Sequence, residues 1–470
     1  EGVQKIHETA MKVFEEVGVQ VNLPEARELF KKAGADVDDE NNIVKCPRKM
    51  VQELVDTAPD NVVLCGRDDD GDHDLDLGGS RVYMGTGGTG LNVQEPGSNE
   101  HRPSEIKDIM DIARVVDKLD NIHFYMLNVY PNDLPEEHVD VNRFGAALTR
   151  TRKHIMGGVY TVEGIQNVVK MAGMAAGSPE KLRERPFISM VTCVISPMKI
   201  DEHYGTLTME VARHGIPVVT PAEPLCGATA PITLAGNVVV HTVDSIAGVM
   251  LAQLTNPGTP AIFGSVASIV DMREMKYLAG AVEMGLLNAA NAQMAQFYKL
   301  PFYGTSGMTD SKVNDAQAGY ESAVTDMLVA LAGGNFIHDA AGFIEFCMTV
   351  SYDKLVIDNE IIGMTMRAVD GITVDDKSLA FDEIAKVGPG GHFVASRHTR
   401  KHMRTEQFMP ELSDRENREV WDENGSKDAH RRATEKAQGL LDAPLESVLP
   451  EDVRNSIKES IPGIKPFLME

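Results

Sequence analysis

The feature that most constrains the fold is a series of eight short apolar, strand-like segments, most of them separated by a stretch in which small and apolar residues recur at helical spacing. Repeated strand-then-helix units are typical of right-handed βαβ crossovers, which build parallel sheets. Eight such strands close a TIM-type (β/α)8 barrel, whereas an open doubly wound sheet needs a reversal of strand order, and none is visible. The α/β barrel is therefore the predicted fold. The expected strands are residues 81–86, 122–129, 154–161, 187–195, 217–221, 260–266, 302–305 and 336–338.

The flanking regions differ in texture from this repeat, so three parts are expected. Residues 1–80 alternate short helices and strands and predict an N-terminal α/β cap, residues 81–362 form the catalytic barrel, and residues 363–470 form a C-terminal helical extension. The barrel helices are expected at residues 141–152, 163–176, 202–214, 236–253, 272–298 and 315–331.

Charge and cysteine content limit the possible partners. The chain has 45 Lys and Arg residues against 70 Asp and Glu, a net charge of −25, and such a surface repels nucleic acids and anionic membranes. We expect no apolar run to reach the ~20 residues of a membrane span, and the amphipathic start of the chain does not resemble a signal peptide, which favours the cytoplasm. The 5 scattered cysteines contain no CxxC pair and predict buried thiols instead of disulfides or a cysteine-rich metal site.

Three motifs resemble ligand-binding motifs, but the residues around each one argue against that function. The acidic segment 68–79 has Gly at the twelfth position, where a calcium loop needs Glu, and is expected to be a hairpin tip. The glycine-rich segment 85–90 is not followed by a helix, which disfavours a dinucleotide site and favours a loop over the barrel mouth. His398 and His402 lie four apart as in some zinc sites, but the neighbouring residues are basic.

Polar residues concentrate after the last two expected strands, at the end of a barrel that carries the chemistry. Asp310 and Gln317 follow the seventh strand and are expected to face the pocket, while Asp315 caps the next helix. His338 ends the eighth strand, and Glu345 follows it. A single histidine is as often structural as functional, so its role stays open at this point.

Several sequence blocks resemble a known family. TDSKVNDAQAGYE, HDAAGFIE, VIDNEIIG and GPGGHFVASRHTRKHMRTEQFMPELSDR, followed by WDENGSKDAHRRA, are similar to blocks of the trimethylamine methyltransferase family, and the resemblance covers nearly the whole chain. It implies a barrel that demethylates methylated amines and passes the methyl group to the cobalt of a separate corrinoid protein. The archetypal trimethylamine enzymes contain pyrrolysine, whereas this chain has only standard residues. It therefore resembles the non-pyrrolysine branch, which is associated with quaternary amines, chiefly glycine betaine, and also proline betaine, carnitine and γ-butyrobetaine.

This resemblance also implies a type of site. A quaternary amine leaves as a neutral tertiary amine, so the site needs a cation pocket and no general acid or metal. Tyr303 and Phe336 are further aromatic candidates for the cation pocket, besides the tyrosines and phenylalanines among the predicted substrate-binding residues. The substrate carboxylate needs hydrogen-bond donors, and His338, Gln317 or the backbone N–H groups of the glycine loop are the candidates. The predicted catalytic residues are His338, Asp310 and Glu345, and the predicted substrate-binding residues are Tyr83, Gly87, Gln317, Tyr320, Phe343 and Phe346.

The methyl acceptor is expected on another protein. The chain has no Asp-x-His-x-x-Gly stretch of the kind that ligates a corrinoid cobalt, so no cofactor is expected to stay bound. The expected partners are a small quaternary amine and a corrinoid protein that docks transiently at the barrel mouth, and a homo-oligomer is expected. Two alternatives remain: the same chemistry on another betaine or a tertiary amine, and a non-catalytic scaffold barrel in a corrinoid methyl-transfer system.

Overall fold

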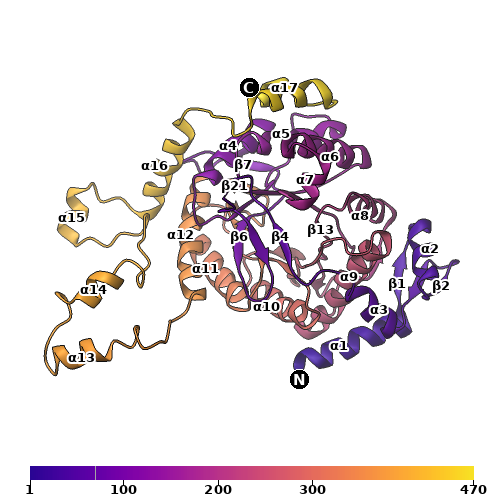
Figure 1. Cartoon of the computed structure of the whole chain (residues 1–470), viewed down its shortest axis with the longest axis horizontal. Helices are drawn as coiled ribbons and strands as arrows, with labels where there is room; N and C mark the ends of the chain where they lie inside the picture. Colours follow the sequence, from indigo (N-terminus) through magenta and orange to yellow (C-terminus); the bar gives the residue numbers. More distant parts are fainter. Residues whose placement is uncertain (69) are drawn as a thin grey trace.

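Eight parallel strands close a barrel in the order β10-β11-β13-β15-β18-β19-β6-β9 in the computed structural model, which describes residues 1–68 and 70–470 (Figure 1). Seven of the eight predicted segments contain one barrel strand and the eighth, 336–338, covers the first half of the last strand, so the predicted (β/α)8 fold is confirmed. The strands are β6 (Tyr83–Thr86), β9 (Phe124–Met126), β10 (His154–Gly158), β11 (Ile188–Val191), β13 (Val218–Val219), β15 (Ala261–Gly264), β18 (Phe302–Thr305) and β19 (Phe336–Ala341).

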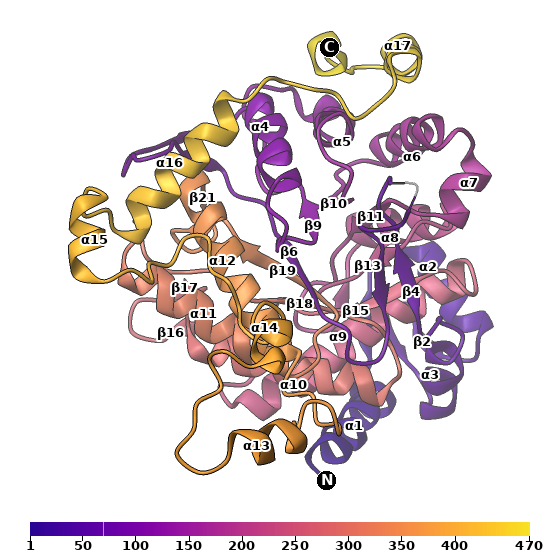
Figure 2. The ribbon, with the colours of Figure 1, turned by 60° about the vertical axis from the view of Figure 1, so that its left-hand side comes forward.

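A ring of helices covers the outside of the barrel (Figure 2). Their N-termini are fixed by side-chain caps where the sequence offers them: Asp201 accepts the Tyr204 N–H, and Asp315 accepts the Ala318 N–H as predicted. The helices are α4 (Ile106–Asp117), α5 (Val139–Leu148), α6 (Val162–Ala176), α8 (Glu202–His214), α9 (Leu234–Thr255), α10 (Val282–Phe297), α11 (Ala316–Leu331) and α12 (Tyr352–Val369).

The helix predicted over residues 272–298 begins later than expected. Its first ten residues instead complete a hairpin of β16 (Ser268–Asp271) and β17 (Lys276–Leu278). The turn forms because the Asp271 carboxylate accepts the Arg273 N–H and Met275 adopts a positive φ of 56°. This hairpin lies on the carboxyl-terminal side of the barrel.

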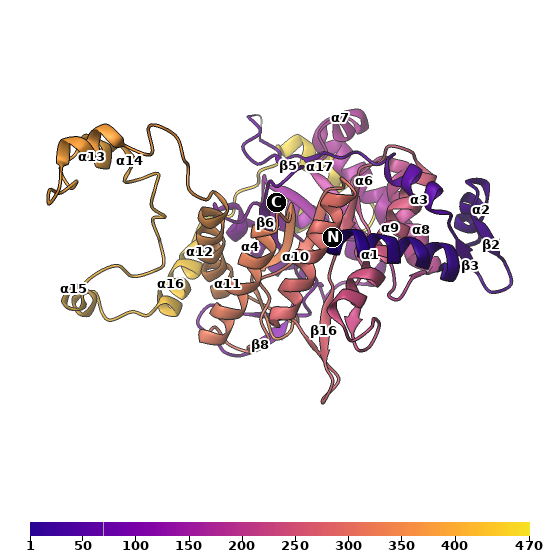
Figure 3. The same cartoon turned by 90° about the horizontal axis from the view of Figure 1, so that it is seen from below.

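A second hairpin closes the opposite end. Strands β4 (Val62–Leu64) and β5 (Leu75–Leu77) pair antiparallel. Their buried leucines pack with interior side chains of the barrel, including Phe124 and Phe336. Figure 3 shows β5 on the opposite side of the barrel from β8 and β16. The acidic segment 68–79 contains the hairpin loop and the whole of its second strand, except Asp69, which lies outside the described residues. The amino-terminal end of the barrel is therefore filled with apolar side chains.

Two small sheets tie the loops to the barrel. The first strands of the chain form a sheet with β12, which follows barrel strand β11. On the carboxyl-terminal side, β7 and β8 form a sheet with β20 and β21, and β14 pairs with β16. These elements are α1 (Gly2–Lys12), η1 (Val13–Val17), β1 (Val19–Val21), α2 (Pro24–Lys32), β2 (Asp36–Asp38), β3 (Ile43–Lys45), α3 (Arg48–Val55), β7 (Asn92–Gln94), β8 (His101–Pro103), β12 (Lys199–Ile200), β14 (Leu225–Cys226), β20 (Phe343–Ile344) and β21 (Thr349–Ser351).

Helix α9 corrects one expectation. It has 22 residues and is, by length and composition, apolar enough to span a membrane, so the expectation that no apolar run reaches that length is wrong. Within the protein, 72% of its most apolar window is buried. It packs against α1, α3, α8 and α10, and burial of this kind is typical of a core helix.

The C-terminal part is helical, as expected, and has two regions. Helix α16 (Ala429–Asp442) packs on α12, and the last elements, α17 (Glu451–Ser460) and η3 (Pro466–Met469), pack near α5 and α6. Between α12 and α16, α13 (Phe381–Val387), α14 (Arg397–His402) and α15 (Arg418–Glu423) extend away from the barrel (Figures 1 and 3). The division of the chain into three parts at residues 80 and 362 stays a prediction.

Candidate active site at the barrel mouth

The last barrel strand carries an irregularity at its carboxyl end. Strand β19 shifts register against β6 between Ile337 and Ala341, and Asp339 has a positive φ of 61°. A bulge of this kind re-aims a side chain, and a non-glycine residue in this conformation must be held by its surroundings. Here the carboxylate of Asp339 is buried at the level where the barrel opens.

The two oxygens of Asp339 have different surroundings. Oδ2 accepts the Thr305 hydroxyl at 2.7 Å and lies 2.9 Å from His338 Nε2. Oδ1 is buried and has no hydrogen-bond partner among the described residues. Because an unpartnered buried carboxylate oxygen is costly, Oδ1 is suited to face a cationic ligand.

Gly87 makes room for this carboxylate. A Cβ atom on Gly87 would lie 1.6 Å from Asp339 Oδ1, so any side chain there would displace the carboxylate. The glycine loop after β6 thus approaches the last strand closely, as glycine alone permits.

His338 supports Asp339 from below. Its Nδ1 lies 2.8 Å from the Gly304 carbonyl oxygen, which can only accept, so Nδ1 carries a proton. The imidazole stacks on Tyr303 with centroids 4.0 Å apart, and Tyr303 in turn contacts Phe336. These rings form an aromatic floor under the mouth.

A second carboxylate faces the same opening. Glu223 follows β13 and is partly open to solvent at the mouth, since its residue is exposed. Its pKa is raised to about 7, first because neighbouring groups displace water around the carboxyl and then by the negative charge of Asp339. Burial, and next the charge of Glu223, also raises the pKa of Tyr277 on β17. The mouth therefore combines two acidic groups with tyrosine side chains.

Two thiols near these carboxylates stay protonated. Burial raises the pKa of Cys193 to about 12, with the charge of Glu223 as the next cause. Burial also raises the pKa of Cys347 well above its usual value, with the charges of Asp339 and Glu223 as the next causes. A thiol in such surroundings is a poor nucleophile.

The mouth holds no group of three His, Cys, Asp or Glu side chains arranged to bind a metal ion, and the rest of the chain that the structure describes holds none either.

A buried cation lies on the other side of the glycine loop. Arg143 on α5 is fully buried and donates to four uncharged acceptors. They are the Thr89 hydroxyl at 3.2 Å, the Leu127 carbonyl at 2.7 Å, the Tyr160 hydroxyl at 3.2 Å and the Gly158 carbonyl at 3.4 Å. None of these acceptors carries a charge, although the buried Asp140 carboxylate is nearby: burial raises its pKa, and the charge of Arg143 opposes that rise. The guanidinium thus places a partly balanced positive charge beside the mouth.

Two of the predicted residues after β18, Asp310 and Gln317, lie around the Glu321 carboxylate, which accepts the Asp310 N–H at 2.9 Å. Asp310 accepts the Ala279 and Gly280 N–H groups at 2.8 and 3.0 Å and so fixes the loop that leads into α10. Gln317 donates to Glu321 at 2.9 Å. Tyr320 is 59% exposed on the outer face of α11.

The predicted residues after β19 lie in a left-handed turn beyond the bulge. Glu345 contacts His101 Nδ1 at 2.9 Å and accepts the Thr349 hydroxyl at 2.6 Å. The ring of Phe346 is covered by the chain's own Lys312 ammonium, 4.1 Å from its centroid. Phe343 is buried on β20 behind the glycine loop.

Tyr83 lies at the other end of the barrel. It begins β6, and its hydroxyl accepts the Asp76 N–H of the closing hairpin at 3.3 Å. Of the nine predicted site residues, the structure brings His338 and Gly87 together around Asp339 and distributes the other seven around this centre or away from it.

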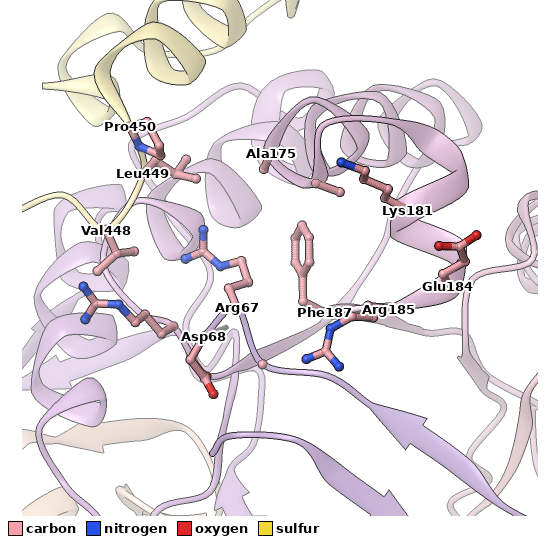
Figure 4. Close-up of a pocket in the computed structure, with 13 residues that line it drawn as sticks. Arg67, Asp68, Ala175, Lys181, Glu184, Arg185, Phe187, Val448, Leu449 and Pro450 are labelled. Carbon is pink, nitrogen blue, oxygen red and sulfur yellow. The ribbon is translucent and has the colours of Figure 1, made fainter. Parts of the chain in front are cut away.

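A basic pocket also lies at the amino-terminal end (Figure 4). Its volume is about 550 Å³, and Arg67, Arg152, Lys181 and Arg185 line it together with Phe187, which directly precedes β11. Part of its wall comes from the helix α7 (Pro179–Glu184). Parallel barrels carry stabilising contacts at this end and chemistry at the other, so the mouth is the stronger site.

Comparison with known proteins identifies the family. The family model described as trimethylamine methyltransferase (MTTB) matches residues 1–463. The chain belongs to the trimethylamine methyltransferase family. The resemblance seen in the sequence blocks is thereby confirmed.

Relatives within the trimethylamine methyltransferase family match most of the chain. A trimethylamine methyltransferase MttB of Desulfitobacterium hafniense is 37% identical over 461 residues, covering 98% of this chain and 92% of that protein. A glycine betaine methyltransferase of another strain of that organism is 34% identical over 421 residues, covering 89% and 87%. The crystal structure of the Methanosarcina barkeri monomethylamine methyltransferase MtmB matches with a TM-score of 0.51 at 12% identity, over 93% of this chain and 91% of that one, which supports the barrel fold.

Sequence reasoning missed the central residues of this family member's mouth. Asp339 directly follows His338, but strand alternation would turn it away from the barrel interior, and only the bulge turns it inward. Glu223 and Arg143 carried no motif. One signal was available for Glu223, since it is the only charged residue shortly after the fifth strand.

Proposed function

We propose that this protein transfers a methyl group from a quaternary amine, best matched by glycine betaine, to the Co(I) of a corrinoid carried by a separate protein. The observation that carries the proposal is the unpartnered buried oxygen of Asp339, which lies above an aromatic floor and near a second carboxylate, Glu223. This combination suits a permanent cation.

The energetics favour a methylated ammonium group in this place. A cation over an aromatic face gains ~0.5–2 kcal/mol per contact, and more when water is excluded. Two nearby carboxylates repel each other, and this repulsion is the second cause, after loss of water, of the raised pKa of Glu223; a cation between them relieves it. A quaternary ammonium group cannot lose its charge, so it gains this stabilisation at any pH at which the carboxylates are ionised.

A zwitterion fits the charges better than a simple amine. Asp339 and Glu223 supply negative charge, while Arg143 supplies a positive field beyond the glycine loop. A betaine has an ammonium group that suits the negative charges of Asp339 and Glu223 and a carboxylate that suits the positive charge of Arg143, whereas trimethylamine has no carboxylate. The 34% identity to a glycine betaine methyltransferase agrees with this choice. The trimethylamine alternative has its own support, namely the 37% identity to a trimethylamine methyltransferase.

The proposed chemistry needs no acid from the protein. Co(I) supplies the electron pair for the new cobalt–carbon bond, the carbon–nitrogen bond breaks, and its electron pair stays on nitrogen as a neutral tertiary amine. No proton has to move. The protein's task is to hold the ammonium in line with the acceptor, with Asp339 contacting the cation and with His338 and Thr305 fixing the carboxylate.

A substrate panel tests the proposal. The purified chain is mixed with cob(I)alamin and each amine, and methylcobalamin formation is followed by absorbance. We expect turnover with glycine betaine and little with trimethylamine. Activity with carnitine alone would overturn the choice of betaine, and silence with every amine would favour the scaffold alternative.

A pair of variants tests the site within the same assay. Asp339→Asn should lower kcat/KM at least tenfold, because it removes the negative charge next to the ammonium. The matched control is Asp60→Asn, at an exposed carboxylate, which should leave kcat/KM unchanged. Equal activity of both variants would remove Asp339 from the site.

A further inference from the structure

A long arm leaves the body of the protein after α12. We define the arm as residues 370–411, which follow the end of α12 and precede the buried Leu412. From residue 366 to residue 411 no residue is buried, although this stretch includes α13 and α14. Figures 1 and 3 show both helices well away from the barrel.

The arm exposes large apolar side chains that a free surface rarely carries together. Ile372 is 87% exposed, Val394 80% and Phe381 75%, and other exposed members are Val374, Leu379, Ile384, Phe393, Met403 and Met409. Helices of 7 and 6 residues are too short to be stable by themselves in water. The arm therefore has the character of a segment that another surface covers.

The root of the arm is fixed while its far part is free. The Glu360 carboxylate accepts the N–H groups of Glu411, Leu412 and Ser413 at 2.7 to 3.0 Å. Arg367 donates to the Glu406 carbonyl. Between α13 and α14 lies an open groove of about 710 Å³, lined by Leu379 and Phe381 and by charged side chains of both helices. The arm is thus held in a set direction with an unfilled groove.

The charge of one segment of the arm indicates what covers that segment. Residues 386–405 contain five Lys and Arg residues and no Asp or Glu, whereas the rest of the arm contains one Lys and seven Asp and Glu residues and the chain as a whole has a net charge of −25. A basic segment on an acidic protein is complementary to a second copy of that protein.

The body offers a matching apolar face next to the arm's root. Helices α10 and α11 pack together, and their outer sides expose side chains at helical spacing. On α10, Val282 is 47% and Leu286 44% exposed. On α11, Tyr320, Val324 and Leu331 are 59%, 45% and 60% exposed. Because α12 packs against α11, the arm of a neighbouring copy related by a two-fold axis can reach this face.

We infer that two copies of this chain exchange arms, with the arm of each copy packed on the α10–α11 face of the other. The exchange is reciprocal, so the same two surfaces are used twice and the assembly closes. It buries the apolar side chains of both surfaces and places the basic segment on an acidic partner. This inference does not depend on the proposed substrate.

Sedimentation of the full chain with two single variants tests the exchange. The wild type should be a dimer, and both Phe381→Asp in the arm and Val324→Asp on the face should shift it to monomer at the same concentration. Neither side chain is buried in its own copy, so the circular dichroism and thermal midpoint should barely change. The control is Met275→Asp, at an exposed residue of the β16–β17 turn, which should stay dimeric.

Mixing the two variants identifies the partner as a second copy. The Phe381→Asp chain keeps an intact face and the Val324→Asp chain keeps an intact arm, so an equimolar mixture should form dimers with one of the two contacts. A monomeric wild type at about 100 μM, a dimer insensitive to either substitution, or a mixture that stays monomeric would overturn the inference. If the arm binds only a different protein, the wild type will be monomeric at this concentration.

Discussion

Asp339 shows how one residue can define a site that strand periodicity does not reveal. Its carboxylate lies inside the barrel because β19 bulges, and Gly87 leaves the space that it fills. The neighbouring His338 has both ring nitrogens engaged, one by Gly304 and one by Asp339. At this scale the mouth is an arrangement of fixed charges and not a proton relay.

The proposed role of Glu223 predicts a pH dependence. With a pKa of about 7, its carboxyl is mostly neutral below that pH and negatively charged above it. Only the charged form attracts an ammonium group, so KM for glycine betaine should fall as the pH rises from about 6 to about 8. Initial rates with cob(I)alamin at constant ionic strength measure this.

Glu223→Gln provides the contrast, because it is neutral at every pH. This variant should show a KM that is several-fold higher at about pH 8 and nearly flat across the range. A wild-type slope that persists in Glu223→Gln would assign the titration to another group.

The candidate site was only partly predictable at the residue level. Polar residues after the last two strands correctly drew attention to His338, whose strand ends at the mouth. The same reasoning could not tell that Asp310 and Glu345 are engaged by backbone N–H groups, His101 and Thr349, because such contacts depend on loops far apart in the sequence. Asp339 depended on a register shift, for which sequence spacing gives no signal.

At the level of elements, a buried ion pair joins α12 to the end of β19. Lys354 Nζ contacts the Asp358 carboxylate and donates to the Ser322 hydroxyl at 2.8 Å, while Asp358 also accepts the Gly342 N–H at 2.8 Å. Both side chains are fully buried. Burial raises the pKa of Asp358, and Lys354 opposes that rise. The pair thus anchors the strand that carries the bulge.

Removing the lysine should destabilise the fold. Lys354→Met leaves Asp358 buried without its cation, and the loss of one partner of a buried pair typically costs ~3–5 kcal/mol of the free energy of unfolding. The thermal midpoint of the full chain should fall accordingly. The control is Lys107→Met, which breaks a pair with Asp111 at 3.0 Å in which Lys107 is 74% exposed and which should cost less than ~1 kcal/mol. Similar midpoints for both variants would contradict the anchoring role.

Most elements were predictable because their signals are local. Apolar strands and amphipathic helices follow from periodicity, and all eight barrel strands appeared where expected. The β16–β17 hairpin was missed because its reversal depends on a few turn residues, Asp271 to Met275, inside a stretch whose composition also suits a helix.

The whole molecule combines an acidic body with an apolar arm that contains one basic segment, residues 386–405. The apolar part of an exchanged arm is insensitive to moderate salt, while the charge attraction is screened once the Debye length falls below ~10 Å. The inferred dimer should therefore weaken with salt but persist.

We expect the dissociation constant of the dimer to rise roughly tenfold between about 50 mM and about 500 mM salt. Sedimentation equilibrium measures it directly. The double variant Arg400→Gln/Lys401→Gln should show a shallower dependence, and a dissociation constant that falls with salt would argue against charge as the reason for the choice of partner.

The hairpin of β4 and β5 gives the barrel a single entrance. Anything that reaches Asp339 must therefore pass through the mouth, and so must anything that leaves. If the methyl acceptor arrives on a protein that covers this opening, the amine has to enter first and the demethylated product has to wait until the acceptor protein departs. The filled barrel end thus predicts a compulsory order of binding and release, with the amine as the leading substrate.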